Sequence, residues 1–288
     1  MNLLLTNEGH GLKIAIQGEM GSNSHMATVA MLGNRKGLEI IACSVSAEVL
    51  AKVVSGDADG AVLPIENSLH GSVAEHYDLL LELPVRIERE SLLRIRHNVI
   101  AMPGVKLEEV RRVMSHPVAL SQCRRFLVGH PEFQVVPFYD TAGSVKHLMG
   151  SGLRDVAGIA PELAATEYGA EVLMAGVEDH AENYTRFHLV LREDAGDDYV
   201  EEAVAADKMS LAFAIEHRPG TLVAALERLA GAGVDLTKIE SRPVPGSPWE
   251  YVFYVDVRFD RLEKADVAVA ALREHCRMVK VLGRYRAA

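Results

Sequence analysis

Short apolar runs alternate with segments of helical period along residues 13–192. Eight runs rich in apolar and β-branched residues predict strands, and apolar residues recur every three or four positions between them. The predicted strands are Lys13–Gln17, Ile40–Ala42, Gly60–Pro64, Asn98–Ala101, Gln134–Pro137, Val156–Ala160, Val172–Met174 and Phe187–Leu191. Helical periodicity stands out in Val73–Glu82 and Ser144–Met149. This alternation predicts an α/β domain with mainly parallel strands buried under helices on both faces.

Residues 208–288 show a different order of elements. The pattern predicts strands at Met209–Ile215, Asp235–Arg242, Glu250–Arg258 and Val279–Arg284, with helices at Thr221–Ala232 and Lys264–Glu274. The resulting βαββαβ order is that of a ferredoxin-like fold. Apolar residues alternate along the third of these strands. We therefore expect one face of the sheet to pack under both helices, while the other face stays half-open for a partner.

The segment Glu193–Asp207 separates these two patterns. It carries seven acidic residues and no basic ones, which predicts a solvated linker. The sequence therefore predicts a domain of residues 1–192, a linker of residues 193–207 and a domain of residues 208–288. A length of 288 residues fits two domains of ordinary size.

Composition narrows the classes of function. Hydrophobic residues make up 49% of the chain and charged residues 24%, which is typical of a globular protein. With 30 Lys and Arg against 40 Asp and Glu, the net charge of −10 disfavours nucleic acid and anionic lipid as partners. The sequence shows neither a secretory signal nor a transmembrane run, so we expect a soluble cytoplasmic protein.

Metal and disulfide chemistry find little support in the sequence. Cys43, Cys123 and Cys276 are odd in number and far apart, which fits neither a disulfide framework nor a zinc cluster. The chain has no H-E-x-x-H pair and no G-x-S-x-G elbow, so we expect neither a metallohydrolase nor a serine hydrolase with such an elbow.

Three polar segments each follow a predicted strand and lead into a helix. The first runs from Gly18 to His25, the second contains Asn67 and Ser68, and the third runs from Asp140 to Ser144. Taken alone, the first is better explained by an ordinary capped turn, and for the second a structural and a binding role are about equally well supported. Ligands of parallel sheets collect at the carboxyl ends of strands, so three such segments at one cleft would suit a small ligand with more than one negative charge.

A fourth segment places a hydroxyl, a cation and an aromatic ring in succession. Thr185, Arg186 and Phe187 stand at the entrance of the last strand before the linker. Such a set places a proton donor beside a cation that binds carboxylates through two hydrogen bonds. Taken alone, the tripeptide is better explained by a surface arginine and a core phenylalanine.

Taken in order, these segments resemble the prephenate dehydratase family over nearly the whole chain. The resemblance is carried by the glycine-rich loop Gly18–His25, by Leu63–Val73, by Ser115–Cys123, by Thr141-Ala142, by Ile159–Leu173 and by Thr185-Arg186-Phe187. The C-terminal βαββαβ unit looks like an ACT regulatory domain. Its two effector-binding motifs correspond to Gly220, Thr221, Leu222 and Val223, and to Glu240, Ser241, Arg242 and Pro243.

The resemblance implies an activity and a fold. The family converts prephenate to phenylpyruvate without a cofactor or metal, in a two-lobed catalytic domain like a periplasmic binding protein, here with chain crossings expected near residues 90 and 180. It implies a catalytic Thr185 that protonates the leaving hydroxyl, with Arg186 and Phe187 beside it. Substrate contacts would come from Ser22, His25, Asn67, Ser68 and Thr141.

The resemblance also implies regulation and leaves alternatives open. L-phenylalanine would bind the ACT domains as an effector, at an interface in a homodimer or homotetramer. Because no room precedes the first predicted strand for a chorismate mutase domain, we expect a monofunctional enzyme. Asn23 replaces an aromatic residue of the family's first loop, and Thr221 replaces a common alanine. Because of the departure at Asn23, arogenate, the amino analogue of prephenate, is an alternative substrate, while Thr221 bears on sensitivity to phenylalanine. A non-catalytic receptor for small carboxylates is the alternative from another class of function.

Overall fold

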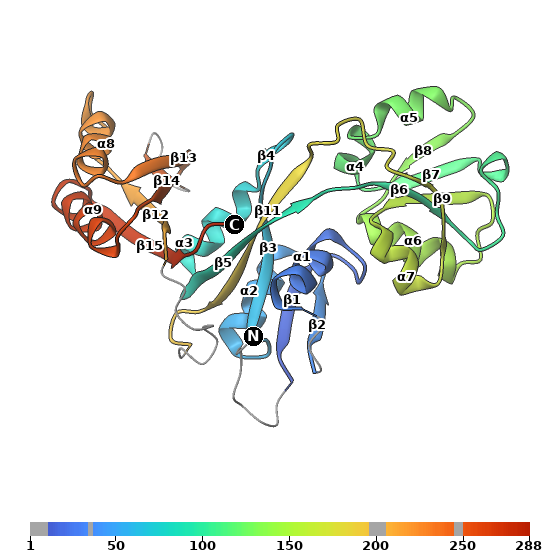
Figure 1. Ribbon diagram of the computed structural model, residues 1–288, viewed down its shortest axis with the longest axis horizontal. Coiled ribbons are helices and arrows are strands. Elements are labelled where there is room, and N and C mark those ends of the chain that lie inside the picture. The colour runs from blue at the N-terminus through green and yellow to red at the C-terminus, as the bar shows by residue number, and fades with distance from the viewer. Residues whose placement is uncertain (1–10, 34–36, 196–205, 245–249) are drawn as a thin grey trace. The chain divides into compact units, whose positions relative to one another are not determined.

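The computed structural model describes residues 11–33, 37–195, 206–244 and 250–288 (Figure 1). Most of the predicted acidic linker, residues 196–205, and the turn at residues 245–249 lie outside these ranges. Contacts between residues divide the described chain into two compact units. Unit 2 contains Gly11–Val73 and Ser91–Phe187, and unit 1 contains Ala74–Glu90 and His188–Ala288. The predicted domain boundary between residues 192 and 193 stays a prediction.

The first sheet of unit 2 is built around a buried central strand. Strand β1 (Lys13–Gln17) pairs in parallel with β2 (Glu39–Cys43) on one side and with β3 (Gly60–Asn67) on the other. Helices α1 (Asn23–Leu32) and α2 (Ser46–Ser55) contact this sheet. A two-residue strand, β4 (Gly71–Ser72), folds back antiparallel on the end of β3. The carboxyl ends of β1 and β3 therefore carry the first two predicted polar segments.

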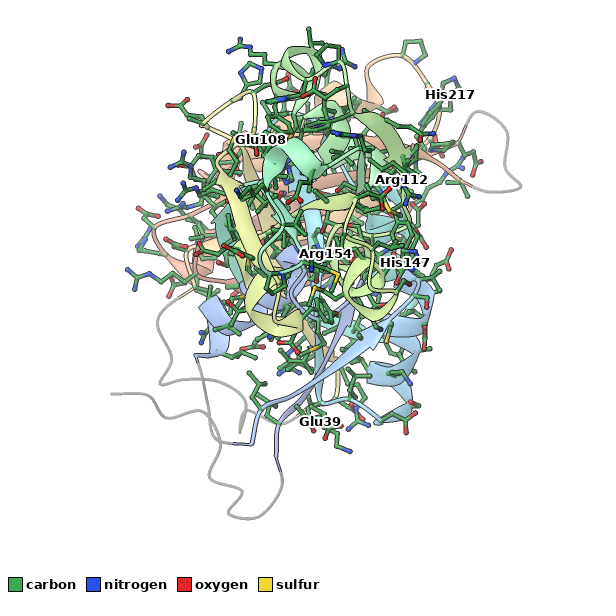
Figure 2. The ribbon with its side chains drawn as sticks, turned by 90° about the vertical axis from the view of Figure 1, so that its right-hand side faces the viewer. Glu39, Glu108, Arg112, His147, Arg154 and His217 are labelled. Atoms are coloured by element: carbon green, nitrogen blue, oxygen red, sulfur yellow. The ribbon has the colours of Figure 1, made fainter. Side chains whose placement is uncertain are left out.

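The second sheet of unit 2 has the order β10-β6-β9-β7-β8. Its strands are β6 (Asn98–Ala101), β7 (Arg112–Ser115), β8 (Gln134–Pro137), β9 (Val156–Ala160) and β10 (Glu171–Ala175). Strand β7 pairs in parallel with β8 and β9, as predicted, whereas β6 runs antiparallel to both of its neighbours. Arg112, labelled in Figure 2, stands at the start of β7. It forms an ion pair of 3.0 Å with Asp155.

Helices cover both faces of this second sheet, as the sequence predicts. Val99 and Ala101 of β6 pack with the region of α4 (Pro117–Ser121) and α5 (Arg124–Gly129). Ile100, which points to the opposite face because strand side chains alternate, packs with α6 (Thr141–Gly150) and α7 (Glu162–Tyr168) (Figure 1). The third predicted polar segment thus stands at the N-terminus of α6.

The C-terminal part of unit 1 has the predicted βαββαβ order. Its elements are β12 (Lys208–Ala214), α8 (Thr221–Gly231), β13 (Asp235–Pro243), β14 (Tyr251–Arg258), α9 (Leu262–His275) and β15 (Met278–Tyr285). The strands form the antiparallel order β13-β14-β12-β15, with the first and third strands of the unit side by side. Met209, Leu211 and Phe213 of β12 are buried against both helices. The ferredoxin-like arrangement is therefore confirmed.

The opposite face of this C-terminal sheet is not half-open, and that expectation is wrong where α3 (Ala74–Glu82) covers it. Tyr77 of α3 packs on Tyr254 of β14 with ring centroids 5.2 Å apart, and Asp78 binds Arg242 of β13 at 2.8 Å. Lys280 of β15 donates to carbonyl groups at the end of α3. The chain itself therefore supplies a partner for this face, from a segment more than a hundred residues earlier in the sequence.

Strand β5 (Val85–Arg94) pairs in parallel with β15 at a single position, where Ile87 faces Gly283. A side chain at position 283 would collide with the Ile87 carbonyl oxygen, so only glycine allows this close approach. Strand β11 (Tyr184–Arg192) contributes its first residues to unit 2 and its remaining residues to unit 1. The predicted Thr185-Arg186-Phe187 tripeptide therefore lies in unit 2, at the start of β11.

Candidate functional site

The end of β3 and the start of β11 bring Asn67 and Thr185 into contact. The Oδ1 atom of Asn67 accepts hydrogen bonds from the backbone N–H groups of Leu69 and His70, both at 3.0 Å. These two donors identify which end of the Asn67 amide is the oxygen, so the Nδ2 group must face β11. There it donates to Thr185 Oγ1 at 3.0 Å. The lone pairs of Thr185 thus receive a hydrogen bond, and its own hydroxyl hydrogen is directed elsewhere.

A buried asparagine completes this arrangement. Asn183 is fully buried, and its Oδ1 atom accepts from Asn67 Nδ2 at 2.8 Å. The Tyr184 carbonyl oxygen lies 3.2 Å from the same nitrogen. The sequence-based site omitted Asn183. Asn183 directly precedes β11, and its contact with Asn67 spans 116 residues, so no local pattern in the sequence identified it.

Arg186 and Phe187 follow Thr185 into the interior. Arg186 Nη2 donates to Glu66 Oε2 at 3.1 Å, and only 9% of the Arg186 side chain is exposed. Phe187, the next residue of β11, is almost completely buried. The charge of Arg186 is thereby fixed within unit 2 by the residue that precedes Asn67. Glu66 belongs to the predicted strand-end motif, but sequence reasoning gave it no role.

Ser68 joins the two strands through its backbone and its side chain. Its N–H donates to the Tyr184 carbonyl at 2.8 Å, and its hydroxyl accepts from the Tyr184 N–H at 3.0 Å. The same hydroxyl donates to the Glu182 carbonyl at 3.3 Å. Ser68 therefore holds Asn67 and Thr185 in register.

A hydrogen-bonded relay attaches the loop after Asn67 to α4. Buried His97 contacts Gln122 Oε1 through Nε2 at 2.7 Å, and Gln122 Nε2 contacts His70 Nδ1 at 3.1 Å. Because an amide oxygen only accepts and an amide nitrogen only donates, His97 is protonated on Nε2 and His70 accepts on Nδ1. Burial lowers the pKa of His97, more than the hydrogen bond to Gln122 and the charge of Glu178 raise it. Burial thus favours a neutral His97, against the effect of the relay.

The first loop forms a second group with the start of α6. Ser22 is the N-cap of α1, with its hydroxyl 3.4 Å from the His25 N–H, and His25 Nδ1 accepts from the Gly21 N–H at 2.9 Å. Burial lowers the pKa of His25. Gly18, with a φ of 97°, lies so close to Asp140 that a Cβ would come within 2.7 Å of its carboxylate. Ser22 and His25 are thus near the N-terminus of α6, whose first residue is the half-buried Thr141.

Glu19 holds this loop on α6 and the segment before it. Its carboxylate accepts from Tyr139 Oη at 2.7 Å and from Lys146 Nζ at 2.8 Å. Burial raises the pKa of Glu19, but these two hydrogen bonds outweigh burial and lower it overall. Burial and the hydrogen bond to Glu19 raise the pKa of Tyr139 to about 12. Sequence reasoning missed Glu19, Tyr139 and Lys146, because their contacts span more than a hundred residues.

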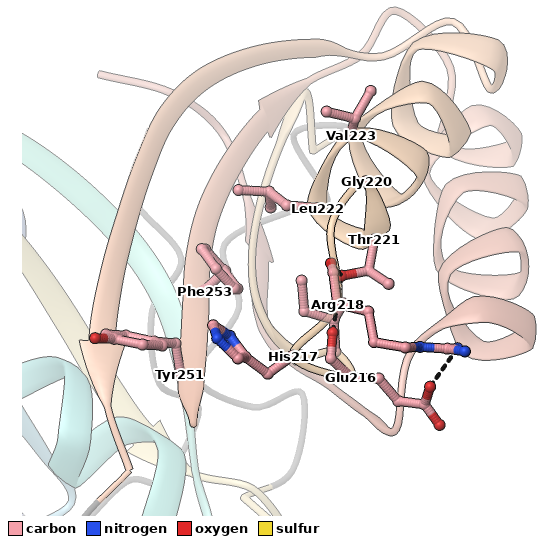
Figure 3. A pocket seen from close by; sticks show the side chains of 10 residues that line it. Glu216, His217, Arg218, Gly220, Thr221, Leu222, Val223, Tyr251 and Phe253 are labelled. Carbon is pink, nitrogen blue, oxygen red and sulfur yellow. Dashed lines mark hydrogen bonds and ion pairs between the residues drawn. The ribbon is translucent and has the colours of Figure 1, made fainter. Parts of the chain in front are cut away.

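The predicted effector motifs lie in unit 1. The turn before α8 lines a pocket of about 220 Å³ (Figure 3). Its walls include all four residues of the first motif, Gly220, Thr221, Leu222 and Val223. Leu222 and Phe253 supply apolar surface to it, and His217 lies beside Phe253. The Thr221 hydroxyl bonds the carbonyl groups of Glu216 and Arg218 at 2.8 Å each, so this threonine stabilises the turn itself.

The second effector motif occupies the end of β13. Arg242 binds Asp78 through two nitrogens, at 2.8 and 3.4 Å, and Glu240 lies 3.9 Å from Lys238. Glu240, Ser241, Arg242 and Pro243 do not contribute to the walls of the pocket that the first motif lines among the described residues. The first motif thus lines the pocket, whereas Arg242 of the second motif contacts α3.

The described part of the chain holds neither a cluster of metal-ligating side chains nor a membrane-spanning helix. Residues 11–33, 37–195, 206–244 and 250–288 contain no group of three His, Cys, Asp or Glu side chains arranged to hold a metal ion. Within the same part of the chain, no helix is long and apolar enough to span a membrane.

Known proteins resemble the chain in sequence over nearly its whole length. A family model described as prephenate dehydratase matches residues 14–195. An arogenate dehydratase/prephenate dehydratase of Arabidopsis thaliana is 35% identical over 291 residues, covering 97% of this chain and 74% of the relative. The matched region includes both groups of residues described in unit 2.

Solved structures resemble the chain in fold as well as in sequence. A prephenate dehydratase of Arthrobacter aurescens in complex with L-Phe is 32% identical, with a TM-score of 0.85, over 96% of this chain and 90% of that one. A structure described as a novel type of quorum quenching acylase is also 32% identical, with a TM-score of 0.83, over 96% of this chain and 98% of that one. Both likenesses extend through the C-terminal βαββαβ unit.

Proposed function

Because this chain belongs to the prephenate dehydratase family, we propose that it converts prephenate to phenylpyruvate with Thr185 as the proton donor. The observation that carries the proposal is the hydrogen bond from Asn67 Nδ2 to Thr185 Oγ1. It leaves the threonine hydrogen available to a substrate oxygen. Family membership favours an enzyme over the alternative of a non-catalytic carboxylate receptor.

The reaction needs orientation and one proton. The bond between the ring carbon and its carboxylate breaks, and that electron pair moves into the ring as carbon dioxide departs. The ring hydroxyl leaves with the electrons of its C–O bond and takes a proton from Thr185 to become water. The Oγ1 atom then carries developing negative charge, which the N–H of Asn67 stabilises at 3.0 Å, and solvent later restores the proton. Formation of an aromatic ring drives these steps.

The substrate's charges need partners of opposite sign or hydrogen-bond donors. Arg186 follows the proton donor directly and supplies a buried positive charge. Around the first loop and α6, the Ser22, His25 and Thr141 side chains offer polar contacts for the remaining carboxylate and keto groups. Ser68 acts by fixing the strand ends. Arogenate remains the alternative substrate, since the relatives include enzymes described as arogenate dehydratases.

The test is turnover by the purified chain, followed by the absorbance of phenylpyruvate, with arogenate assayed in parallel. Thr185→Val should lower kcat by about a hundredfold or more, because it removes the donor and keeps the shape, whereas Thr185→Ser should retain part of the activity. Thr28→Val is the matched control, since Thr28 is also buried and its hydroxyl bonds the Ser24 carbonyl within α1. Full activity of Thr185→Val would contradict the proposal.

We also propose that L-phenylalanine binds the pocket before α8 and lowers turnover, at an interface between subunits of a homodimer or homotetramer. The proposal is supported by a relative whose structure is described as a complex with L-Phe. Leu222 and Phe253 would contact the ring, while the turn at Gly220 would offer N–H groups to the carboxylate.

Calorimetry with L-phenylalanine tests this site. Leu222→Asp should abolish binding and inhibition without changing turnover in the absence of effector. Val267→Asp is a control, because Val267 is an exposed apolar residue of α9 outside the pocket. Unchanged inhibition in Leu222→Asp would place the effector site elsewhere.

A further inference from the structure

Asn183 is buried more completely than a substrate-binding residue can be. None of its surface is exposed, and its Nδ2 group has no hydrogen-bond partner among the described residues. A buried amide without a partner for its N–H groups lowers stability, so retaining this side chain needs another reason. The reason must lie in its Oδ1 atom, which accepts from Asn67 Nδ2 at 2.8 Å.

The direction of that hydrogen bond is determined by the surrounding backbone. Leu69 and His70 donate to the oxygen of Asn67, so Asn67 can present only N–H hydrogens to its other neighbours. The atom of Asn183 that faces them must therefore be an acceptor. Asn67 Nδ2 has two hydrogens but three acceptors nearby, namely Asn183 Oδ1 at 2.8 Å, Thr185 Oγ1 at 3.0 Å and the Tyr184 carbonyl at 3.2 Å.

Asn183 determines how those two hydrogens are shared. By taking one of them at the shortest distance, it sets the plane of the Asn67 amide and leaves the second hydrogen for Thr185. Without this acceptor, the amide can turn a hydrogen toward the Tyr184 carbonyl, and the bond to Thr185 loses its alignment. We propose that Asn183 is a positioning residue that orients the Asn67 amide and, through it, the Thr185 hydroxyl, without contacting substrate. The inference rests on the proposed role of Thr185.

Substitutions at position 183 can distinguish the role of the side chain as a hydrogen-bond acceptor from the effect of its volume. Asn183→Leu keeps a similar volume and removes the acceptor, so kcat should fall roughly tenfold or more while KM changes less than about threefold, as expected for lost alignment. Asn183→Asp keeps an acceptor facing Asn67 and should lose less activity than Asn183→Ser, which is too short to reach it. Thermal unfolding shows which variants fold.

The kcat of the double variant Asn67→Ala/Asn183→Leu distinguishes a positioning role of Asn183 from a purely structural one. If Asn183 acts through Asn67, Asn183→Leu causes no further loss of kcat once Asn67 is alanine. The control is Asn98→Leu, because Asn98 is also buried in unit 2 but bonds the Ala160 carbonyl and the Gly176 N–H. Its effect on kcat should multiply with that of Asn67→Ala.

Each other outcome overturns the inference. Multiplying losses in the double variant would show that Asn183 acts independently of Asn67, and a raised KM at unchanged kcat would show that it serves substrate binding. If Asn183→Leu does not fold, equal losses in Asn183→Asp and Asn183→Ser overturn the role of the acceptor. Absence of wild-type turnover on both substrates would refute the proposed function together with this inference, whereas an active wild type with a fully active Asn183→Leu variant refutes the inference alone.

Discussion

At position 67, an amide and a carboxylate differ in the direction of the hydrogen bond they form with Thr185. Asn67→Asp keeps an oxygen for the Leu69 and His70 N–H groups but cannot donate to Thr185 Oγ1. The threonine would instead donate its hydrogen to the new carboxylate. We expect kcat to fall by about a hundredfold or more, with the fold retained, in a steady-state assay combined with circular dichroism.

The corresponding control uses an asparagine that does not touch the threonine. Asn98→Asp introduces the same chemical change at a buried position on β6, where the side chain bonds backbone groups. It should affect thermal stability more than kcat. Equal losses of kcat in the two variants would mean that a buried carboxylate damages unit 2 generally, and that the direction of the Asn67 bond is unimportant.

His97 gives unit 2 a predictable response to acid. Burial lowers its pKa from the ordinary value of 6.5, so the unfolded chain takes up a proton at a higher pH than the folded chain does. The contribution of His97 to stability is therefore fully present above pH 6.5 and declines as the pH falls from 6.5 toward the folded pKa, by up to about 1.4 kcal/mol per pH unit. Urea unfolding at several pH values should show a shallower decline in His97→Gln. An unchanged slope would assign the acid response to other groups.

At the scale of elements, one lysine stabilises the end of a helix. Lys280 Nζ on β15 donates to the carbonyl oxygens of Leu80, Leu81 and Leu83, at 2.8 to 3.0 Å. These carbonyl groups lie at the C-terminal end of α3, where the last carbonyl groups of a helix have no N–H partner within it. A cation there also interacts favourably with the helix dipole.

Lys280→Met should therefore destabilise the protein by about 1–3 kcal/mol in urea unfolding, because it leaves carbonyl groups without their donor. Lys264→Met is the matched control. Lys264 of α9 pairs with Asp260, an exposed residue that precedes this helix, and an exposed pair of this kind contributes little to stability. Equal effects of the two substitutions would contradict the capping role of Lys280.

Elements with strong apolar patterns could be predicted from sequence almost to the residue. The strands Asn98–Ala101, Gln134–Pro137 and Val156–Ala160 have the predicted bounds. Strand β5 was missed, because Arg86, Glu88 and Glu90 make it look like a polar surface segment. Those charges are balanced by ion pairs, such as Arg86 with Glu88 at 3.2 Å, that sequence periodicity does not reveal.

In the candidate site too, features that depend on neighbouring residues could be predicted from sequence, whereas contacts between distant residues could not. Sequence placed Asn67 after one strand and Thr185 at the entrance of another, because strand ends and turn residues leave a local pattern. The hydrogen bond that joins them spans 118 residues. The roles of Asn183 and Glu19 depend on such contacts as well, so neither could be derived from its neighbours in the sequence.

At the scale of the whole molecule, a buried charge cluster joins distant parts of unit 1. Glu90 of β5 accepts from Lys208 Nζ of β12 at 2.8 and 3.0 Å and from the Ala288 N–H at 3.0 Å. Asp256 of β14 and His188 of β11 each lie 3.9 Å from the pair. Burial raises the pKa of Glu90, but the nearby His188, the hydrogen bonds from Lys208 and the charge of Lys208 outweigh burial and hold it far below its ordinary value.

Replacing Lys208 alone should lower the free energy of unfolding more than replacing Glu90 and Lys208 together. Lys208→Met leaves the buried Glu90 and Asp256 carboxylates without their cation and should destabilise the protein by about 3–5 kcal/mol. The double variant Glu90→Gln/Lys208→Met should recover part of that loss, since it leaves one buried negative charge fewer. Chemical unfolding of the two single variants and the double variant checks this, and a double variant that is no more stable than Lys208→Met would contradict it.

The stabilisation that the Glu90 carboxylate provides should be lost at acidic pH. Because the folded pKa of Glu90 lies below 4.5, its contribution to stability is present above pH 4.5 and is lost as the pH falls toward the folded value. The stability difference between the wild type and Glu90→Gln should thus be largest near neutral pH and shrink below pH 4.5. Glu39→Gln is the control, because Glu39 is exposed (Figure 2) and its surface pair with Lys13 at 3.9 Å contributes little at any pH. A difference for Glu90→Gln that stays constant with pH would mean that Glu90 stabilises unit 1 through packing, whereas a shrinking difference identifies its charge as the stabilising feature.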